Sequence, residues 1–258
     1  MVGVLGVSAS AILVRFSQAP SGVTAAYRLG WTVLLLLPVV LLRCRAELRR
    51  VTARDLVLCG ASGVLLALHF LTWFESLKRT SVASSTVLVS TEVIFTALGF
   101  ALFLHGKIPR LGVWAILLAF GGSALLALSG GGGAGELSGN LLALAAASAA
   151  AVYTLIGRIQ RGHLSTTVYT FLTYLACFLT LLLGTAAAGT PLTGYGGREW
   201  LIGLALAVLC TLLGHSLFSW CLKYLSPSYV SAAKLCEPVF SSPVSYTHLR
   251  AHETDQYL

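Results

Sequence analysis

Leu77-Lys78-Arg79-Thr80-Ser81, followed by Glu92-Val93-Ile94-Phe95, recurs as Leu222-Lys223-Tyr224-Leu225-Ser226, followed by Glu237-Pro238-Val239-Phe240. The Leu, Lys, Ser, Glu and Phe of the first copy each reappear 145 residues later. Each Glu lies within an otherwise apolar segment. Self-similarity at a fixed long offset indicates that a structural unit has been duplicated within the chain.

The composition indicates that lipid surrounds most of the chain. Of its 258 residues, 57% are hydrophobic and only 10% are charged, whereas soluble domains carry about 25% charged residues. Apolar runs of about 20 residues match the length that a helix needs to cross about 30 Å of hydrocarbon. The duplicated unit is therefore a membrane unit.

Nine membrane-spanning helices are expected. Helices are the favoured element because lipid offers no hydrogen-bond partner to a strand edge, and alternation of period two, typical of a barrel, is absent. The connections are short and rich in turn-forming residues. The expected spans are 1–16, 22–42, 55–76, 81–104, 111–129, 140–160, 165–187, 199–222 and 227–243.

The duplication is expected to be inverted. Five spans separate the two copies, and five is an odd number, so the second copy must enter the membrane from the opposite side. The expected fold is an all-α membrane protein, an inverted repeat of two five-helix units with nine spans present and the tenth missing. The expected boundaries are a first repeat over 1–130, a glycine-rich linker over 131–139, and a second repeat over 140–243.

The segment 244–258 does not continue the repeat. It has no apolar periodicity, whereas the first copy continues here into more helix and then a fifth span. The string from Ser245 to Thr254 is similar to translated sequencing adapter, so we expect 244–258 to be a non-native tail. A native polar tail is the alternative. A chain without its tenth helix could also be an inactive fragment.

Charge placement predicts the orientation. The net charge is +8, but the basic residues lie in short loops beside apolar segments, which argues against nucleic acid as a partner. The excess on one side predicts a cytoplasmic N-terminus in the cell membrane. That side holds Arg43, Arg45, Arg49, Arg50, Arg54, Lys107, Arg110, Arg158, Arg161 and Lys223. The other side holds Lys78, Arg79 and Arg198, with Arg15 at a helix end.

Two stretches resemble the EamA-type, ten-helix branch of the drug/metabolite transporter superfamily. They are Ala67 to Ser85 and Gly214 to Pro227, the latter leading into Glu237-Pro238-Val239-Phe240. The resemblance covers residues 1 to about 243. It implies two inverted five-helix units and transport, commonly export, of small organic solutes. Two departures from the family pattern are Val93 in place of a proline after Glu92, and His105-Gly106 in place of a Gly-Glu pair.

Glu92 and Glu237 are the leading candidate site residues. An ionisable group within a span costs at least about 2.5 kcal/mol and usually faces a cavity or a partner. Either Glu could hold a proton or contact a cationic substrate group; a structural ion pair is the alternative. Lys234 lies three residues before Glu237 on the same helical face, so an ion pair between these two is expected.

Aromatic, basic and hydroxyl side chains complete the candidate set. His69 and Trp73 are four residues apart and share a helix face. A similar arrangement with a spacing of five, His215 and Trp220, follows in the second copy. A histidine with an ordinary pKa near 6.5 could respond to a proton gradient, and an aromatic ring beside it could stack on a substrate. Helix packing is the alternative for the two histidines, and a position at the membrane interface is the alternative for the two tryptophans. Further candidates are Arg28, which could meet an anionic substrate group or Glu75, and Ser85, for which helix–helix hydrogen bonding is the alternative.

The sequence therefore predicts a secondary transporter, an exporter of small organic metabolites that works by alternating access around a central cavity. No catalytic constellation, metal-ligand spacing, phosphate loop or Cys-x-x-Cys pair is present, so no enzyme, cofactor or metal is expected. The alternative is a membrane-embedded enzyme that modifies lipids. That enzyme would need an acidic pair at a membrane surface, and the only acids near one another on the cytoplasmic side are Glu47 and Asp55.

Overall fold

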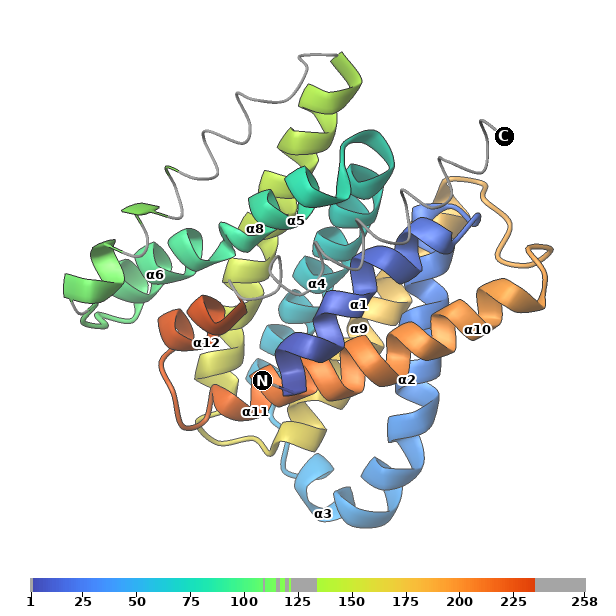
Figure 1. The fold of residues 1–258 in the computed structure, drawn as a ribbon. Helices are drawn as coiled ribbons and strands as arrows, with labels where there is room; N and C mark the ends of the chain where they lie inside the picture. Colours follow the sequence, from blue (N-terminus) through green and yellow to red (C-terminus); the bar gives the residue numbers. More distant parts are fainter. Residues whose placement is uncertain (1, 109, 115–116, 119–120, 122–133, 235–258) are drawn as a thin grey trace.

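The described part of the protein is a bundle of packed helices (Figure 1). The computed structural model describes residues 2–108, 110–114, 117–118, 121 and 134–234. The predicted linker, the tail and most of the predicted span 111–129 lie outside these residues. The helices are α1 (Val2–Phe16), α2 (Ser21–Arg43), α3 (Arg45–Leu48), α4 (Ala53–Arg79), α5 (Val82–Ser90), α6 (Glu92–Phe103), α8 (Ala134–Gln160), α9 (Thr166–Ala187), α10 (Gly197–Ala205), the π-helix η1 (Leu206–His215), α11 (Ser216–Cys221) and α12 (Pro227–Lys234).

Hydroxyl side chains fix where several helices begin. The Thr52 hydroxyl accepts from the backbone N–H of Asp55, and the Asp55 carboxylate accepts from the N–H of Thr52, which makes a capping box at the start of α4. Ser81 caps α5, and Ser165 caps α9; each hydroxyl accepts from the backbone N–H three residues later. These caps satisfy backbone donors that the first turn of each helix leaves without intrahelical partners.

Within the part of the chain that the structure describes, six helical segments are long and apolar enough to cross a membrane. They are Ser21–Arg43, Ala53–Arg79, Ser84–Phe103, Glu136–Gln160, Thr166–Ala187 and Gly197–Cys221, and each overlaps a span predicted from the sequence. The first predicted span is the shorter apolar helix α1, of 15 residues. The last predicted span begins with α12 and continues outside the described residues. The total of nine spans therefore stays a prediction.

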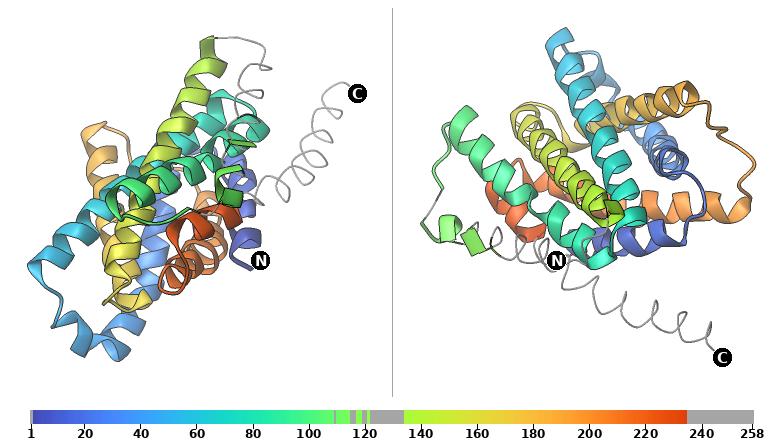
Figure 2. Two further views of the ribbon diagram at one scale, coloured as in Figure 1. Left: turned by 90° about the vertical axis from the view of Figure 1, so that its left-hand side faces the viewer. Right: turned by 90° about the horizontal axis from the view of Figure 1, so that it is seen from above.

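The two repeats are visible in the positions of helix starts. The second, third and fourth helices of the first repeat, α2, α4 and α5, begin at residues 21, 53 and 82, and their counterparts α9, α10 and α12 begin at 166, 197 and 227. The offsets of 145, 144 and 145 residues match the offset of the sequence repeat. Helices of the two repeats interleave, because α4 packs against α8 and α9, and α2 packs against α9 and α10 (Figures 1 and 2).

The bundle has two ends, which are named here by the helices that lie there. The α3 end holds α3, the start of α4, the end of α8 and the start of α9 (Figure 1). The α10 end holds the end of α1, the start of α2, the end of α4 and the start of α10. The two third helices, α4 and α10, therefore begin at opposite ends.

Two spans depart from regular α-helix, and both irregularities lie deep in the bundle. The predicted helix 81–104 is broken at Thr91, whose hydroxyl and N–H both bond to the carbonyl of Leu88, at 2.7 and 3.1 Å. The chain therefore turns before Glu92 although Val93 stands where a proline would be expected. The second irregularity is η1, a ten-residue π-helix within the span Gly197–Cys221; π-turns within α-helices are frequent at functional sites.

His105 ends α6 in a left-handed backbone conformation, with φ of +51°. The next N–H, that of Gly106, bonds back to the carbonyl of Phe100 at 2.9 Å and closes the helix end. Glycine adopts this conformation without a Cβ penalty. We expect His105→Gly to raise the free energy of unfolding by about 0.5–1 kcal/mol, seen as a higher melting temperature in detergent. An unchanged or lower melting temperature would contradict this.

Candidate functional site

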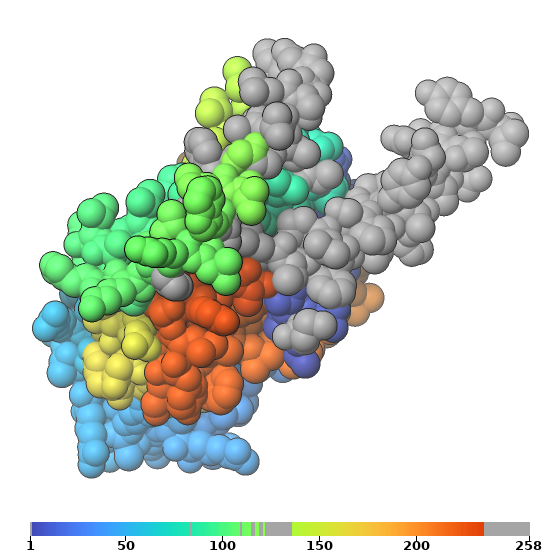
Figure 3. Space-filling view, turned by 60° about the vertical axis from the view of Figure 1, so that its left-hand side comes forward, coloured from blue at the N-terminus to red at the C-terminus, as the bar shows by residue number. Residues whose placement is uncertain are grey.

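A buried ion pair joins the two repeats. The Nζ of Lys234, on α12, lies 2.9 Å from both carboxylate oxygens of Glu92, the first residue of α6. Both side chains are largely shielded, with 12% and 8% of their surfaces exposed. Figure 3 shows α6 and α12 against each other on one face of the molecule. Among the described residues Lys234 therefore pairs with Glu92. The ion pair between Lys234 and Glu237 stays a prediction, because Glu237 lies outside the described residues.

Hydroxyl groups complete the hydrogen bonding of the Glu92 carboxylate. Thr154, on α8, donates to its Oε1 at 2.9 Å, and Ser231, one turn before Lys234, donates to the same oxygen at 3.3 Å. A carboxylate in a low-dielectric interior is stable only when such donors and a counter-charge surround it. Three of these four side chains belong to the second repeat, so the first repeat supplies the acid and the second its partners.

His69 and Trp73 face the same interior from α4. Their rings stack with centroids 5.9 Å apart and planes 24° from parallel. The Nδ1 of His69 lies 2.9 Å from the carbonyl oxygen of Ala146, to which it donates. In the neutral ring, Nε2 is then a hydrogen-bond acceptor. The indole Nε1 of Trp73 is buried and has no hydrogen-bond partner among the described residues.

Arg28 approaches from α2 and is fully buried. Its Nε donates to the hydroxyl of Thr211 at 2.7 Å, one terminal nitrogen donates to Ser10 at 3.2 Å, and the guanidinium lies 4.2 Å from the centre of the Phe70 ring. The contact expected between Arg28 and Glu75 is not formed. Glu75 lies near the end of α4 and instead pairs with Arg79 at 2.9 Å.

The π-helix η1 positions His215 and Thr211. In its widened turn, the hydroxyl of Thr211 donates to the carbonyl of Leu206, five residues earlier, at 3.3 Å. Thr211 then accepts from Arg28, and the His215 ring lies 6.4 Å from that of His69. Arg28 and His69 come from the first repeat, and Thr211 and His215 from the second, so this contact also lies between the repeats.

These side chains surround a small internal cavity of about 40 Å³. One water needs roughly 10–15 Å³ of such volume, so the cavity that the described residues line has room for a few waters. Pockets that bind organic ligands usually have roughly 300–1,000 Å³. The cavity is lined by Val7, Ser10, Arg28, His69, Trp73, Val89, Ser90, Glu92, His215, Phe218, Ser231 and Lys234.

The structure places six of the nine predicted site residues at this cavity: Arg28, His69, Trp73, Glu92, His215 and Lys234. Ser85 lies elsewhere, buried and bonded to the Ser76 hydroxyl at 2.8 Å, as its helix-packing alternative predicts. Trp220 is also elsewhere; it is half-exposed and packs on Tyr224, because α11 turns this side chain outward. Glu237, the ninth, lies outside the described residues.

Sequence reasoning missed Thr154, Ser231 and Thr211. A signal existed for Ser231, which lies three residues before Lys234 and so shares its helix face. No signal pointed to Thr154, because it lies in an alanine-rich helix with no counterpart in the repeat motif. Thr211 depends on η1, and a π-helix leaves no mark in the hydrophobic pattern.

Comparison with known proteins agrees with the two-repeat architecture. Residues 1–128 and 137–253 match the sequence profile of a family described as the EamA-like transporter family. No curated protein matches the chain. Among 26 matching chains of solved structures, one titled "Crystal structure of protein" superposes with a TM-score of 0.72 at 20% sequence identity. That alignment covers 96% of this chain and 85% of the other, and at this identity it shows a shared fold.

Proposed function

Because the chain belongs to the EamA-like transporter family, a family of multi-pass membrane proteins, we propose that it carries small organic solutes across the cell membrane through the cavity around Glu92 and Lys234. The observation that carries this proposal is the position of that ion pair. Its acid comes from one repeat and its base from the other. A solute that competes for either charge would therefore act directly on the contact between the repeats.

The cavity chemistry favours solutes with both polar and flat apolar parts. Trp73 offers a buried N–H that has no acceptor among the described residues, and His69 offers a ring nitrogen beside it. Phe218 adds an apolar ring to the cavity lining. We propose that a solute acceptor binds Trp73 while a charged group replaces one member of the Glu92–Lys234 pair.

The finer parts of the proposal are export, alternating access and a cytoplasmic N-terminus. Alternating access is supported by the small cavity volume, because a site that excludes solute in the closed state must open to one side or the other. A cytoplasmic N-terminus is supported by the basic loops at the α3 end. Coupling to a proton gradient is supported only by the buried Glu92 and the two histidines.

Reconstitution into liposomes tests this function. Vesicles containing the protein are incubated with a defined mixture of small metabolites, with and without an imposed pH gradient, and their contents are measured by mass spectrometry. We expect at least one organic solute to accumulate above the level in protein-free vesicles. Equal contents in both kinds of vesicle, together with modification of the vesicle lipids, would instead favour the lipid-modifying enzyme.

A further inference from the structure

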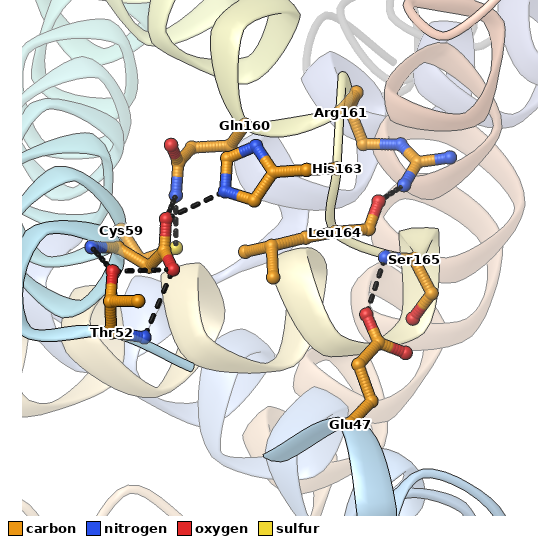
Figure 4. A network of polar contacts seen from close by, with 9 residues as sticks. Glu47, Thr52, Cys59, Gln160, Arg161, His163, Leu164 and Ser165 are labelled. Atoms are coloured by element: carbon orange, nitrogen blue, oxygen red, sulfur yellow. Dashed lines mark hydrogen bonds and ion pairs between the residues drawn. The ribbon is translucent and has the colours of Figure 1, made fainter. Parts of the chain in front are cut away.

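Asp55 holds the two repeats together at the α3 end. This carboxylate is 5% exposed. Its Oδ1 accepts from Nε2 of His163 at 2.7 Å and from the side-chain amide of Gln160 at 3.2 Å. Its Oδ2 serves the capping box of α4. Figure 4 shows the Gln160 and His163 side chains converging from the end of α8 and the loop after it toward the start of α4.

Glu199 holds the two repeats together at the α10 end. This residue is 4% exposed. Oε2 accepts from the Ser17 hydroxyl at 2.6 Å, and Oε1 accepts from the backbone N–H of Gln18 at 3.0 Å. Ser17 and Gln18 lie in the loop between α1 and α2. Glu199 therefore connects the second repeat to the first, and does so at the end opposite to Asp55.

The two acids occupy equivalent positions in the two repeats. Asp55 is the third residue of α4 and Glu199 is the third residue of α10, which are the third helices of their repeats. Each follows an arginine, Arg54 or Arg198. Each bonds to the loop between the first and second helices of the other repeat. The residues that they hold there, Gln18 and His163, are offset by 145, the offset of the duplication itself.

The cavity lies between these contacts. Asp55 and His69 are fourteen residues apart on α4, or roughly 21 Å along a helix. With both acids engaged, the cavity has a volume of about 40 Å³. The Asp55 contacts therefore lie between this cavity and the α3 end, and the Glu199 contacts lie between it and the α10 end.

We propose that Asp55 and Glu199 are a quasi-symmetric pair of gate latches, one per repeat, which close the α3 end and the α10 end respectively. The gating role of the two acids rests on the proposed transport function, whereas the experiment that tests it needs no transport. Opening one end rocks one repeat against the other, so it tightens the opposite contact. Removing one latch shifts the population of states toward opening at that end and away from opening at the other.

The latches are not simple helix caps. A cap serves its own helix, and Thr52 already provides one for α4. At α10, the Glu199 oxygens bond to residues 181 and 182 positions away in sequence rather than to the first turn of α10. Loss of a cap would fray one helix end, whereas loss of a latch changes solvent access at both ends of the bundle.

Thiol accessibility tests the proposal without a transport assay. Cys59 lies one turn beyond Asp55, is 1% exposed and has its sulfur 3.7 Å from the Gln160 amide, so it reports on the α3 end. Thr24, which is 3% exposed and bonded to Ser17, reports on the α10 end when changed by Thr24→Cys. For each measurement, every cysteine other than the reporter is replaced. The rate at which the reporter reacts with N-ethylmaleimide is then measured in detergent micelles.

The two latch variants are expected to have opposite effects. Asp55→Ala should raise the labelling rate of Cys59 about tenfold, equivalent to 1.4 kcal/mol, and lower that of the cysteine at position 24. Glu199→Ala should do the reverse. Arg54→Gln and Arg198→Gln, which change the exposed neighbours on the same helices, should leave both rates within about twofold.

Parallel changes at both reporters would contradict the latches. Asp55→Ala could raise both labelling rates by unfolding the protein. In that case His163→Ala tests the proposal, because it removes the contact between the repeats and leaves the capping box of α4 intact. A reciprocal change in His163→Ala supports the proposal, and no change or a parallel rise overturns it. If the two labelling rates change in opposite directions but the protein moves no solute, the latches are supported and the transport function is rejected.

Discussion

Glu92→Leu is expected to lower the free energy of unfolding by about 3–5 kcal/mol, because it leaves the Lys234 ammonium buried without its counter-charge. It also leaves the Thr154 hydroxyl without its acceptor. Thermal denaturation in detergent, followed by circular dichroism, measures the loss. Lys234→Met should have a comparable effect, since it leaves the carboxylate unpaired.

The double variant measures the interaction between Glu92 and Lys234 apart from the effect of losing either residue alone. Glu92→Leu/Lys234→Met removes both charges and replaces them with apolar side chains, so it should recover most of the stability lost in either single variant. The matched control is Glu75→Leu. It breaks the exposed pair with Arg79, 2.9 Å apart, and should cost at most about 1 kcal/mol. Additive losses in the double variant would show that Glu92 and Lys234 are not coupled.

Gly63→Ala is expected to have the second largest effect. An added Cβ at Gly63 would lie 2.5 Å from the Cβ of Ala176 and 2.6 Å from the carbonyl oxygen of Thr173, so α4 and α9 touch backbone to backbone here. Small residues permit such close approach between membrane helices. The helices must separate to admit the methyl group, and we expect a loss of about 1–3 kcal/mol.

Gly60 provides the control for this substitution. It lies on the same helix, three residues earlier, and an added Cβ there meets no atom within 4 Å. Gly60→Ala should therefore be neutral or stabilise α4 by up to about 1 kcal/mol, through helix propensity alone. The two melting temperatures, compared in the same detergent, check the argument. Equal effects of the two substitutions would mean that α4 and α9 are not in backbone contact.

The sequence carried enough information for the all-helical, two-repeat architecture because duplication leaves its mark in residue order. The 145-residue offset between Lys78 and Lys223 recurs in the helix starts, and the apolar runs correspond to the six long helices. The interruptions were not visible in this way. The break at Thr91 depends on one hydroxyl bonding back to Leu88, and η1 depends on packing that has no sequence period.

Six of the predicted site residues line the cavity, but the contacts between them were not predicted. Helical periodicity places Lys234 beside Glu237, three residues away, and gives no information on groups 142 positions apart such as Glu92. Long-range partners depend on how helices of the two repeats interleave. Trp220 shows the same limit. Its spacing from His215 suggested a pair like His69 and Trp73, but the 145-residue offset relates Trp73 to Phe218, and it is Phe218 that lines the cavity.

Solute flux through the double variant tests the central claim most directly. The claim is that transport works through the contact between the repeats that Glu92 and Lys234 form. For a solute that the wild-type protein moves in liposomes, Glu92→Leu/Lys234→Met should fold and melt near the wild-type temperature, yet its flux should fall at least about tenfold, or 1.4 kcal/mol. Wild-type flux in this folded variant would contradict the account.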